Sequence, residues 1–380
     1  MTVKPRKLCI TLLYIYIYIC ALTYIRWSYV HTPISQRIYI ATQLSIVLIC
    51  LIYIVLSSKV FRVRFLPILL GGMMLYEIII SAVRGLFVTP NFFMDALPWP
   101  LVLIVFYHYS NREQLPSCFK GISITGLILV CILSLPNIFM RELSGTGIFA
   151  TYYCISMLAM VYFFVNDNKV CGVFSALVGI LMVLTAKRGA VIVIALGVGM
   201  YYLLRIQQEE QDIKRIRKMS GYIISIMVIA LVGIYLINSL NLNILDRLLS
   251  MTDDGGSGRT RIWESVLDFY NNSTRREQLF GNGFHAVYYR VRPFGISRYA
   301  HNSYIETLYD YGIVGTALLL MFVLFLLFKF IKIVRKKNKA APAMGFTIII
   351  MLVLSLVSYF FEQSVMITPL CVIWGVCLNK

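Results

Sequence analysis

Charged residues are scarce in this chain, and the usual marks of a soluble protein are missing with them. Only 14% of the 380 residues are charged, whereas 59% are hydrophobic. A soluble domain is nearer half apolar and a quarter charged. Residues 241–303 form the only long polar stretch, so no other segment is long enough to fold as a separate soluble domain. These absences predict an all-α polytopic membrane protein, with residues 1–380 as a single integral membrane domain.

Disulfide and metal-binding signatures are missing as well. None of the nine cysteines lies between residues 241 and 303, and nearly all lie in apolar runs. We therefore expect small buried hydrophobic residues rather than disulfide partners or zinc ligands. Asp253-Asp254 resembles the carboxylate pair of metal-dependent glycosyltransferases, but two carboxylates beside Gly255-Gly256 are more typical of a polar turn. We expect no metal site and no cofactor.

Apolar runs are what the chain has in abundance. A membrane-spanning helix needs roughly 20 apolar residues, or fewer when the flanking side chains snorkel. Twelve such runs occur, at residues 8–25, 38–56, 65–80, 97–109, 121–135, 148–165, 170–186, 189–204, 221–240, 311–330, 344–361 and 365–378. The fourth is short and opens with Pro98-Trp99-Pro100, which suggests a broken or interfacial helix. We expect about 12 transmembrane helices: spans 1–9 within residues 1–240, a large loop with short helices over 241–303, and spans 10–12 within 304–380.

The basic residues follow a pattern of membrane topology, which accounts for the net charge of +18 without nucleic acid as a partner. If the N-terminus is cytoplasmic and the spans alternate, 21 lysines and arginines fall on the cytoplasmic side, against 6 outside it apart from the long loop. This asymmetry is the positive-inside rule. We therefore expect both termini in the cytoplasm and the loop 241–303 on the outer face.

The loop 241–303 uses arginine and no lysine. Its eight arginines are Arg247, Arg259, Arg261, Arg275, Arg276, Arg290, Arg292 and Arg298. A guanidinium binds phosphate through two parallel hydrogen bonds, whereas a lysine ammonium acts as a point charge. The composition therefore predicts a site for phosphate groups rather than only a soluble surface.

A second basic motif, Lys187-Arg188, lies at the outer ends of two spans with almost no linker between them. Charges at membrane depth are costly and usually serve a purpose or snorkel. One interpretation is a cationic pair directed at an anion of the outer leaflet. The other is a tight helix–helix turn whose basic side chains meet lipid headgroups.

Within the loop, Arg259 and Arg261 follow a glycine-rich turn at the start of a helix predicted over 261–269, with Ile262, Val266 and Phe269 at helical spacing. A helix N-terminus presents free N–H groups and a partial positive charge to an anion. The plainer alternative is a flexible loop followed by a docked amphipathic helix.

His301 lies where the loop re-enters the membrane. An imidazole can take a proton from a sugar hydroxyl near neutral pH, and Glu306 or Asp310 could orient the ring. A lone histidine is more often structural, but its position after the arginine loop favours catalysis. Glu77 and Glu362 are further candidates because carboxylates at membrane depth are costly, although either could instead pair with an outer arginine such as Arg84.

These stretches together resemble the bacterial O-antigen polymerase and O-antigen ligase superfamily, whose members have many spans and one large periplasmic loop near the C-terminal third. The resemblance covers residues 185–315, and the N-terminal half is similar only in hydropathy. The motifs that carry it are Arg188-Gly189 at an outer helix end, Gly258-Arg259 with Trp263 four residues after the arginine, Gly281-Asn282-Gly283, and His301-Asn302 followed by Gly312-Ile313-Val314-Gly315.

The resemblance implies a GT-C-like, metal-independent, inverting glycosyltransferase of the bacterial inner membrane, with a glycan on undecaprenyl diphosphate as its donor and an active site facing the periplasm. Arg188 and Arg259 would hold the diphosphate, and His301 would act as base on the acceptor hydroxyl. The residues expected to bind substrate beside them are Arg261, Lys187, Asn302, Tyr304 and Glu306.

Within the superfamily we favour a polymerase, which joins lipid-linked repeat units, because the loop is compact and carries no extra acceptor domain. A ligase that transfers the glycan to lipid A-core stays open. A flippase for the same lipid is the rival from another class, but it should carry charge through many spans rather than on one outer loop. The expected partners are the lipid-linked oligosaccharide and membrane lipid, and a chain-length regulator would be a further one.

Overall fold

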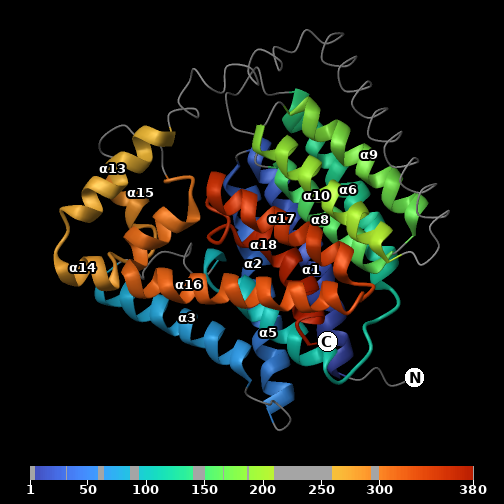
Figure 1. Cartoon of the computed structure of the whole chain (residues 1–380), viewed down its shortest axis with the longest axis horizontal. Coiled ribbons are helices and arrows are strands. Elements are labelled where there is room, and N and C mark those ends of the chain that lie inside the picture. The colour runs from blue at the N-terminus through green and yellow to red at the C-terminus, as the bar shows by residue number, and fades with distance from the viewer. Residues whose placement is uncertain are drawn as a thin grey trace.

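The computed structural model describes residues 5–30, 32–58, 64–85, 94–139, 150–165, 167–185, 188–208, 259–291 and 299–379, and this part of the chain is helical with no strand. Eleven of the twelve apolar runs form helices (Figure 1). They are α1 (Pro5–Val30), α2 (Pro33–Ser57), α3 (Phe65–Val83), α5 (Pro98–Ser110), α6 (Phe119–Phe139), α8 (Ala150–Phe164), α9 (Asn168–Leu184), α10 (Arg188–Gln207), α16 (Ser303–Arg335), α17 (Ala341–Val357) and α18 (Ser364–Cys377). The remaining run, 221–240, lies outside the described residues.

Six of the described helices are long and apolar enough to cross a membrane: α1, α2, α3, α6, α10 and α16. Shorter apolar helices in α8, α9, α17 and α18 accompany them. Their exposed faces carry leucine, isoleucine and valine, as Val55 and Val83 illustrate at more than 70% exposure. Apolar side chains on the outside of a bundle suit a lipid solvent. The prediction of an all-α polytopic membrane protein is confirmed.

The centre of the bundle is formed by short helices rather than by the long ones. α18 packs along α5, and almost every residue of both helices is buried. α5 is continuous from Pro98, and its two prolines occupy the first turn, where a missing N–H costs nothing. The expectation of a broken or interfacial helix over 97–109 is therefore wrong, because this segment is a core helix surrounded by protein.

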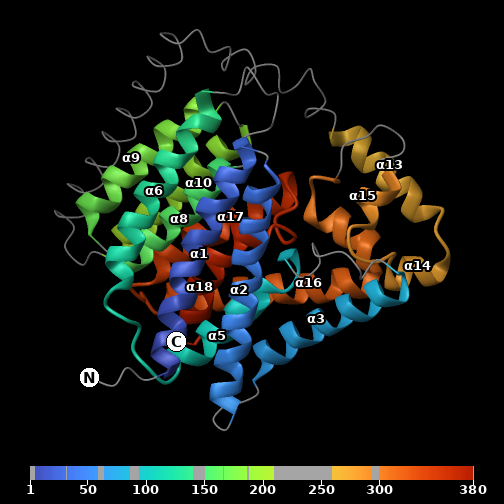
Figure 2. The same cartoon turned by 180° about the vertical axis from the view of Figure 1, so that it is seen from behind.

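Three short helices of the polar loop gather at one end of α16: α13 (Arg259–Asn271), α14 (Arg275–Phe280) and α15 (Ala286–Val291) (Figures 1 and 2). α13 begins close to the predicted 261–269, and its apolar face packs as expected. Ile262 and Val266 are buried in a small core with Val287 and Tyr309, and Phe269 packs at its edge. The loop helices thus dock on the first turns of α16.

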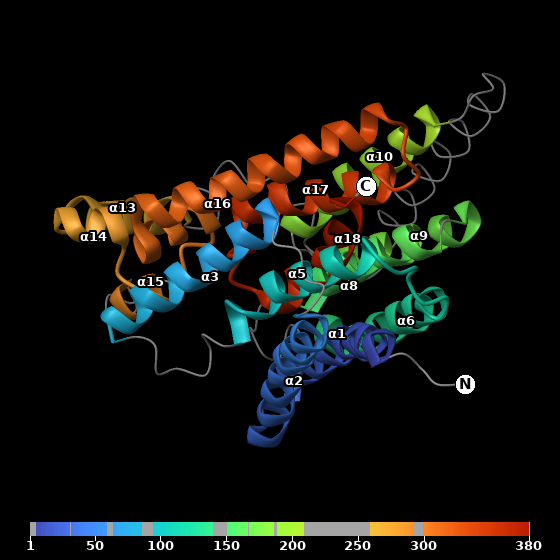
Figure 3. The same ribbon diagram turned by 90° about the horizontal axis from the view of Figure 1, so that it is seen from below.

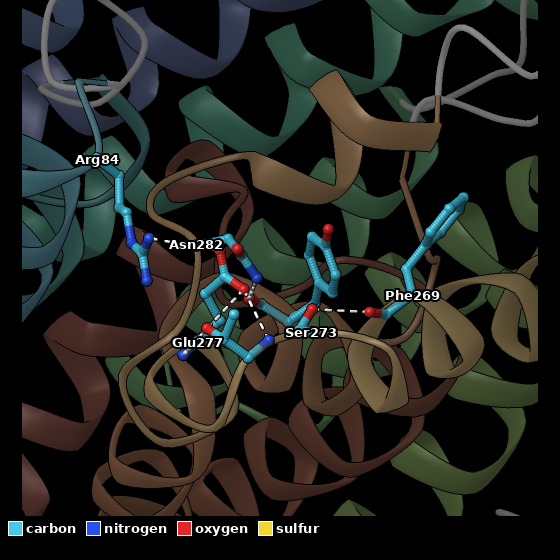
Figure 4. A network of polar contacts seen from close by, with 7 residues as sticks. Arg84, Phe269, Ser273, Glu277 and Asn282 are labelled. Atoms are coloured by element: carbon cyan, nitrogen blue, oxygen red, sulfur yellow. Dashed lines mark hydrogen bonds and ion pairs between the residues drawn. The ribbon is translucent and has the colours of Figure 1, made fainter.

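α16 and α3 run side by side away from the rest of the bundle toward these loop helices (Figure 3). At that end the guanidinium of Arg84, which follows α3, lies 3.5 Å from a carboxylate oxygen of Glu277 in α14 (Figure 4). Arg84 therefore pairs with the loop, and the alternative in which it pairs with Glu77 or Glu362 is wrong.

α16 contains a kink at Gly312, whose φ of 67° is in the left-handed region. The freed carbonyls of the preceding turn are used by the Gly281-Asn282-Gly283 motif: the Gly283 N–H donates to Asp310 O at 2.7 Å. The two backbones approach so closely that a Cβ on Gly281 would collide with the Asp310 carbonyl. A Cβ on Gly312 would collide with the Leu279 carbonyl. The two glycine motifs of the sequence therefore lock the loop onto the kinked helix.

Candidate active site

Ala300, directly before His301, is held at both of its backbone polar groups. Its N–H donates to Oε2 of Glu306 at 2.7 Å, and its carbonyl accepts from Nε1 of Trp263 at 2.7 Å. Glu306 and Ala300 are both fully buried. Because these two bonds come from α16 and α13, they fix the segment that carries His301 between the membrane helix and the loop.

His301 itself adopts a left-handed conformation, with φ of 53°. This is uncommon for residues other than glycine, so the surroundings must hold it there. The next residue, Asn302, is the N-cap of α16, and its Oδ1 accepts from the N–H groups of Tyr304 and Ile305. The half-buried imidazole lies 5.7 Å from the ring of Tyr359, measured between centroids. The Asn302 cap on one side and the two hydrogen bonds of Ala300 on the other thus orient His301.

Arg259 and Trp263 are four residues apart on α13, so they share one face of the helix. Trp263 is anchored to Ala300, and Arg259 lies one helical turn before it. The charge of Arg259 is within electrostatic range of Tyr152 in α8. Arg261, two residues further along, is exposed and faces elsewhere. The arginine–aromatic spacing of the motif is explained by this anchor.

The Arg188-Gly189 motif begins α10, and it meets the same tyrosine. A Cβ on Gly189 would lie 2.8 Å from the Tyr152 hydroxyl and 3.4 Å from Val357, the last residue of α17. The segment after Val357 carries Tyr359, which faces His301. The start of α10 therefore lies against Tyr152, which is within electrostatic range of Arg259, and against the end of α17, which leads to the tyrosine beside His301. Lys187 and the side chain of Arg188 lie outside the described residues.

Three of the expected substrate-binding residues have structural partners. Asn302 uses its side-chain oxygen to cap α16. Tyr304 is half-buried, and its hydroxyl oxygen accepts from Oγ of Ser355 at 3.2 Å, which ties α16 to α17. Glu306 has one carboxylate oxygen on Ala300, while the other has no hydrogen-bond partner in the described part of the chain.

Aromatic residues that the sequence did not indicate lie next to His301. Tyr359 stacks on Tyr299 at 4.3 Å, and Tyr299 meets His285 edge-on at 5.4 Å. Burial lowers the pKa of His285 to about 3, so this second histidine is neutral at physiological pH. Tyr152, Tyr299 and Tyr359 were missed because the chain has 25 tyrosines without distinctive spacing.

Three acidic residues that the sequence analysis named as separate candidates lie close together in the structure. Glu306, Asp310 and Glu362 each present a carboxylate oxygen, and these atoms lie within 4.8 Å of one another. Glu362 lies in the turn between α17 and α18, where burial and then the negative charge of Glu306 raise its pKa well above the usual range. Such a group has the geometry to hold a cation. The other metal candidate, Asp253-Asp254, lies outside the described residues.

Comparison with protein families finds a match that covers part of the chain. Residues 173–320 match the family model described as O-antigen ligase. The matched range contains Gly189, Arg259 and His301, together with the glycine motifs that lock the loop onto α16. Comparison with curated proteins finds no match. Over residues 173–320 the chain is thus similar to the O-antigen ligase family, which confirms the resemblance to the O-antigen polymerase and ligase superfamily.

Proposed function

We propose that this protein is a surface-polysaccharide polymerase that joins undecaprenyl-diphosphate-linked repeat units at the outer face of the bacterial inner membrane. The observation that carries the proposal is that the start of α10 lies against Tyr152, which is within electrostatic range of Arg259, and against the end of α17, which leads to Tyr359 beside His301. Arg259, the start of α10 and His301 come from three distant parts of the sequence and lie within residues 173–320, whereas Tyr152 and Tyr359 lie outside that range.

The proposed reaction is an inverting displacement at the anomeric carbon. The acceptor hydroxyl oxygen forms the new bond as the bond to the diphosphate oxygen breaks, and the electron pair leaves with the diphosphate. His301 takes the hydroxyl proton. Arg259, with Arg188 at the start of α10, neutralises the charge that develops on the leaving diphosphate, so no metal is needed for that step. Lys187 and Arg261 would extend the positive surface toward the lipid headgroup.

Two details of the structure support this assignment of roles. His301 is oriented by protein bonds on both sides, through the Asn302 cap and the Ala300 bonds, as a positioned base requires. Arg259 is half-buried, and its charge is within electrostatic range of Tyr152. Fixed cations in a water-poor site stabilise charge more strongly than mobile surface cations do.

A ligase that transfers the glycan to lipid A-core is the second candidate, because the matched family model is described as O-antigen ligase. The same donor site would serve either reaction. The difference lies in the acceptor, and a polymerase accepts a second copy of its own lipid-linked donor.

The deciding experiment uses the purified full-length protein in proteoliposomes with an undecaprenyl-diphosphate-linked repeat unit as donor. The reaction is run with the donor alone and with added lipid A-core. A ladder of longer lipid-linked glycans from the donor alone supports the polymerase. A product only when lipid A-core is present supports the ligase. Transfer in neither reaction, with movement of the lipid between leaflets, would support the flippase and contradict the proposal.

A further inference from the structure

We propose that the carboxylates of Glu306, Asp310 and Glu362 bind one calcium ion, which fixes the segment beneath His301. All three side chains are buried: Glu306 and Asp310 are 0% exposed and Glu362 is 9% exposed. Their carboxylate oxygens lie within 4.8 Å of one another. Three ionised carboxylates at this separation repel one another, so they must either hold protons or share a cation.

The free oxygens point to a missing ligand. Four buried oxygens of the three carboxylates have no hydrogen-bond partner among the described residues: Oε1 of Glu306, Oδ2 of Asp310 and both oxygens of Glu362. A buried, unpaired carboxylate costs far more than a paired one. Glu362 is the clearest case, because neither of its oxygens is used by the protein. Arg84, the counter-ion that the sequence suggested for Glu362, pairs with Glu277 instead.

The other two carboxylate oxygens, one of Glu306 and one of Asp310, accept hydrogen bonds from backbone N–H groups. Oε2 of Glu306 accepts from the N–H of Ala300, and Oδ1 of Asp310 accepts from the N–H of Val287 at the start of α15. Each of these carboxylates thus holds the loop with one oxygen and leaves the other for the cluster. This division is what an ion ligand with an orienting partner requires.

The supply of free protein oxygens favours calcium over magnesium. The four unpaired carboxylate oxygens would form most of the ion's shell, and water would complete it. A cavity of about 30 Å³ adjoins the cluster at Glu362 and has room for about two waters. Ca²⁺ accepts such a shell, whereas Mg²⁺ keeps several of its waters.

The proposal does not depend on the proposed function. The ion would connect the turn after α17 with the kinked start of α16 and, through Ala300 and Val287, with the loop helices. It would act on the position of the loop, while Arg259 neutralises the diphosphate. Binding and unfolding measurements therefore test the ion site, and they need no transfer reaction.

The test compares the wild-type protein with Glu362→Gln and with Glu264→Gln, a matched change at an exposed glutamate of α13. Each full-length protein is purified in detergent, treated with EGTA and desalted, and Ca²⁺ binding is measured by equilibrium dialysis with ⁴⁵Ca²⁺. We expect one Ca²⁺ per chain for the wild type and for Glu264→Gln. For Glu362→Gln we expect affinity at least about tenfold weaker.

Thermal unfolding separates loss of the site from loss of the fold. Added Ca²⁺ should raise the unfolding temperature of the wild type, because a ligand that binds only the folded state stabilises it. It should not raise that of Glu362→Gln. Without Ca²⁺ this variant should be at least as stable as the wild type, since it loses one of three repelling charges. No bound Ca²⁺ at millimolar concentration, equal binding by Glu362→Gln, or tighter binding of Mg²⁺ would overturn the proposal.

Discussion

His301 is held in a left-handed conformation between a doubly bonded alanine and a helix cap. If its imidazole accepts the proton, His301→Gln should transfer glycan roughly 10²–10⁴-fold more slowly, because an amide cannot take the proton usefully. His301→Ala should be equally slow, and both variants should still bind the donor. The measurement is polymer formed per folded protein, with donor binding determined in parallel.

A structural role for His301 gives the opposite pattern. The glutamine side chain would be tolerated because it keeps hydrogen bonding, while the alanine variant would accumulate poorly in the membrane. Near-normal transfer by His301→Gln would therefore remove His301 as the base. Glu306, Asp310 and Glu362 would then be the groups to test.

Residues with unusual local surroundings could be predicted from the sequence, and common residues could not. Arg259 and His301 stood out because the loop has no lysine and a histidine ends it. Tyr152 and Tyr359 did not, since nothing in their spacing separates them from the other tyrosines. The proximity of Glu362 to Glu306 could not be predicted from the sequence either, because it depends on how the turn after α17 packs against α16.

At the scale of elements, one close approach of two backbones, at Gly281 and Gly312, explains why both glycine motifs are present. Gly281→Ala should strongly destabilise the docking of α14 on α16, because its positive φ and the collision with the Asp310 carbonyl both oppose a side chain. Gly85→Ala is the matched control: Gly85 also has a positive φ, of 71°, but open space around it.

The readout is limited proteolysis of the loop in the folded, detergent-purified protein. Gly85→Ala should cost only about 1 kcal/mol and leave the proteolysis pattern unchanged. Gly281→Ala should be cleaved much faster at Arg275 and Arg276, which are exposed on α14. Similar patterns for the two variants would show that the close approach of the two backbones is not what holds the loop.

α14 begins with a capping box, in which the Thr274 side chain accepts from the Glu277 N–H while Glu277 accepts from the Thr274 N–H at 2.9 Å. Thr274→Ala should destabilise this turn by about 1 kcal/mol. The hydrogen bonds from Thr274 lower the pKa of Glu277, so their contribution is present above the ordinary glutamate pKa and is lost as the pH falls below it.

Hydrogen exchange of the α14 amides can follow this difference. Thr274→Ala should exchange faster than the wild type at pH 7, and the difference should narrow without vanishing as the pH falls below about 4, because, of the two bonds that the Thr274 hydroxyl makes, only the one it donates to Glu277 depends on the carboxylate charge. A difference that does not depend on pH would show that this hydroxyl bond contributes nothing.

Helix positions could be predicted from the sequence far better than helix surroundings. Eleven apolar runs became helices, because length and hydropathy determine whether a segment can satisfy its backbone in lipid. The same properties do not distinguish contact with lipid from contact with protein. α5 was therefore misjudged: an apolar 13-residue helix suits either an interface or a protein core, and packing against α18 decided it.

At the scale of the whole molecule, the charge asymmetry makes the membrane orientation testable. Cys118 is the one exposed cysteine of the nine, all of which the structure describes, and it follows α5 on the expected cytoplasmic side. In spheroplasts, a membrane-impermeant maleimide should label the wild type only after permeabilisation.

A second cysteine provides the opposite marker. Glu264 is exposed on α13 in the loop, so Glu264→Cys in a Cys118→Ser background should be labelled without permeabilisation. If the two sites exchange their behaviour, the topology is inverted and the proposed active site cannot face the periplasm.

The central claim is that arginine holds the lipid diphosphate, and Arg259→Lys tests it most directly because it keeps the charge and removes the bidentate contact. Arg276→Lys, at an exposed site on α14, is the matched control. The measurement is the rate of glycan transfer per folded protein from the undecaprenyl-diphosphate donor in proteoliposomes. Loss of a charge-assisted hydrogen bond costs about 1.5–3 kcal/mol, so Arg259→Lys should be roughly 10- to 100-fold slower, with Arg276→Lys near the wild type. Equal rates for Arg259→Lys and Arg276→Lys would contradict the claim.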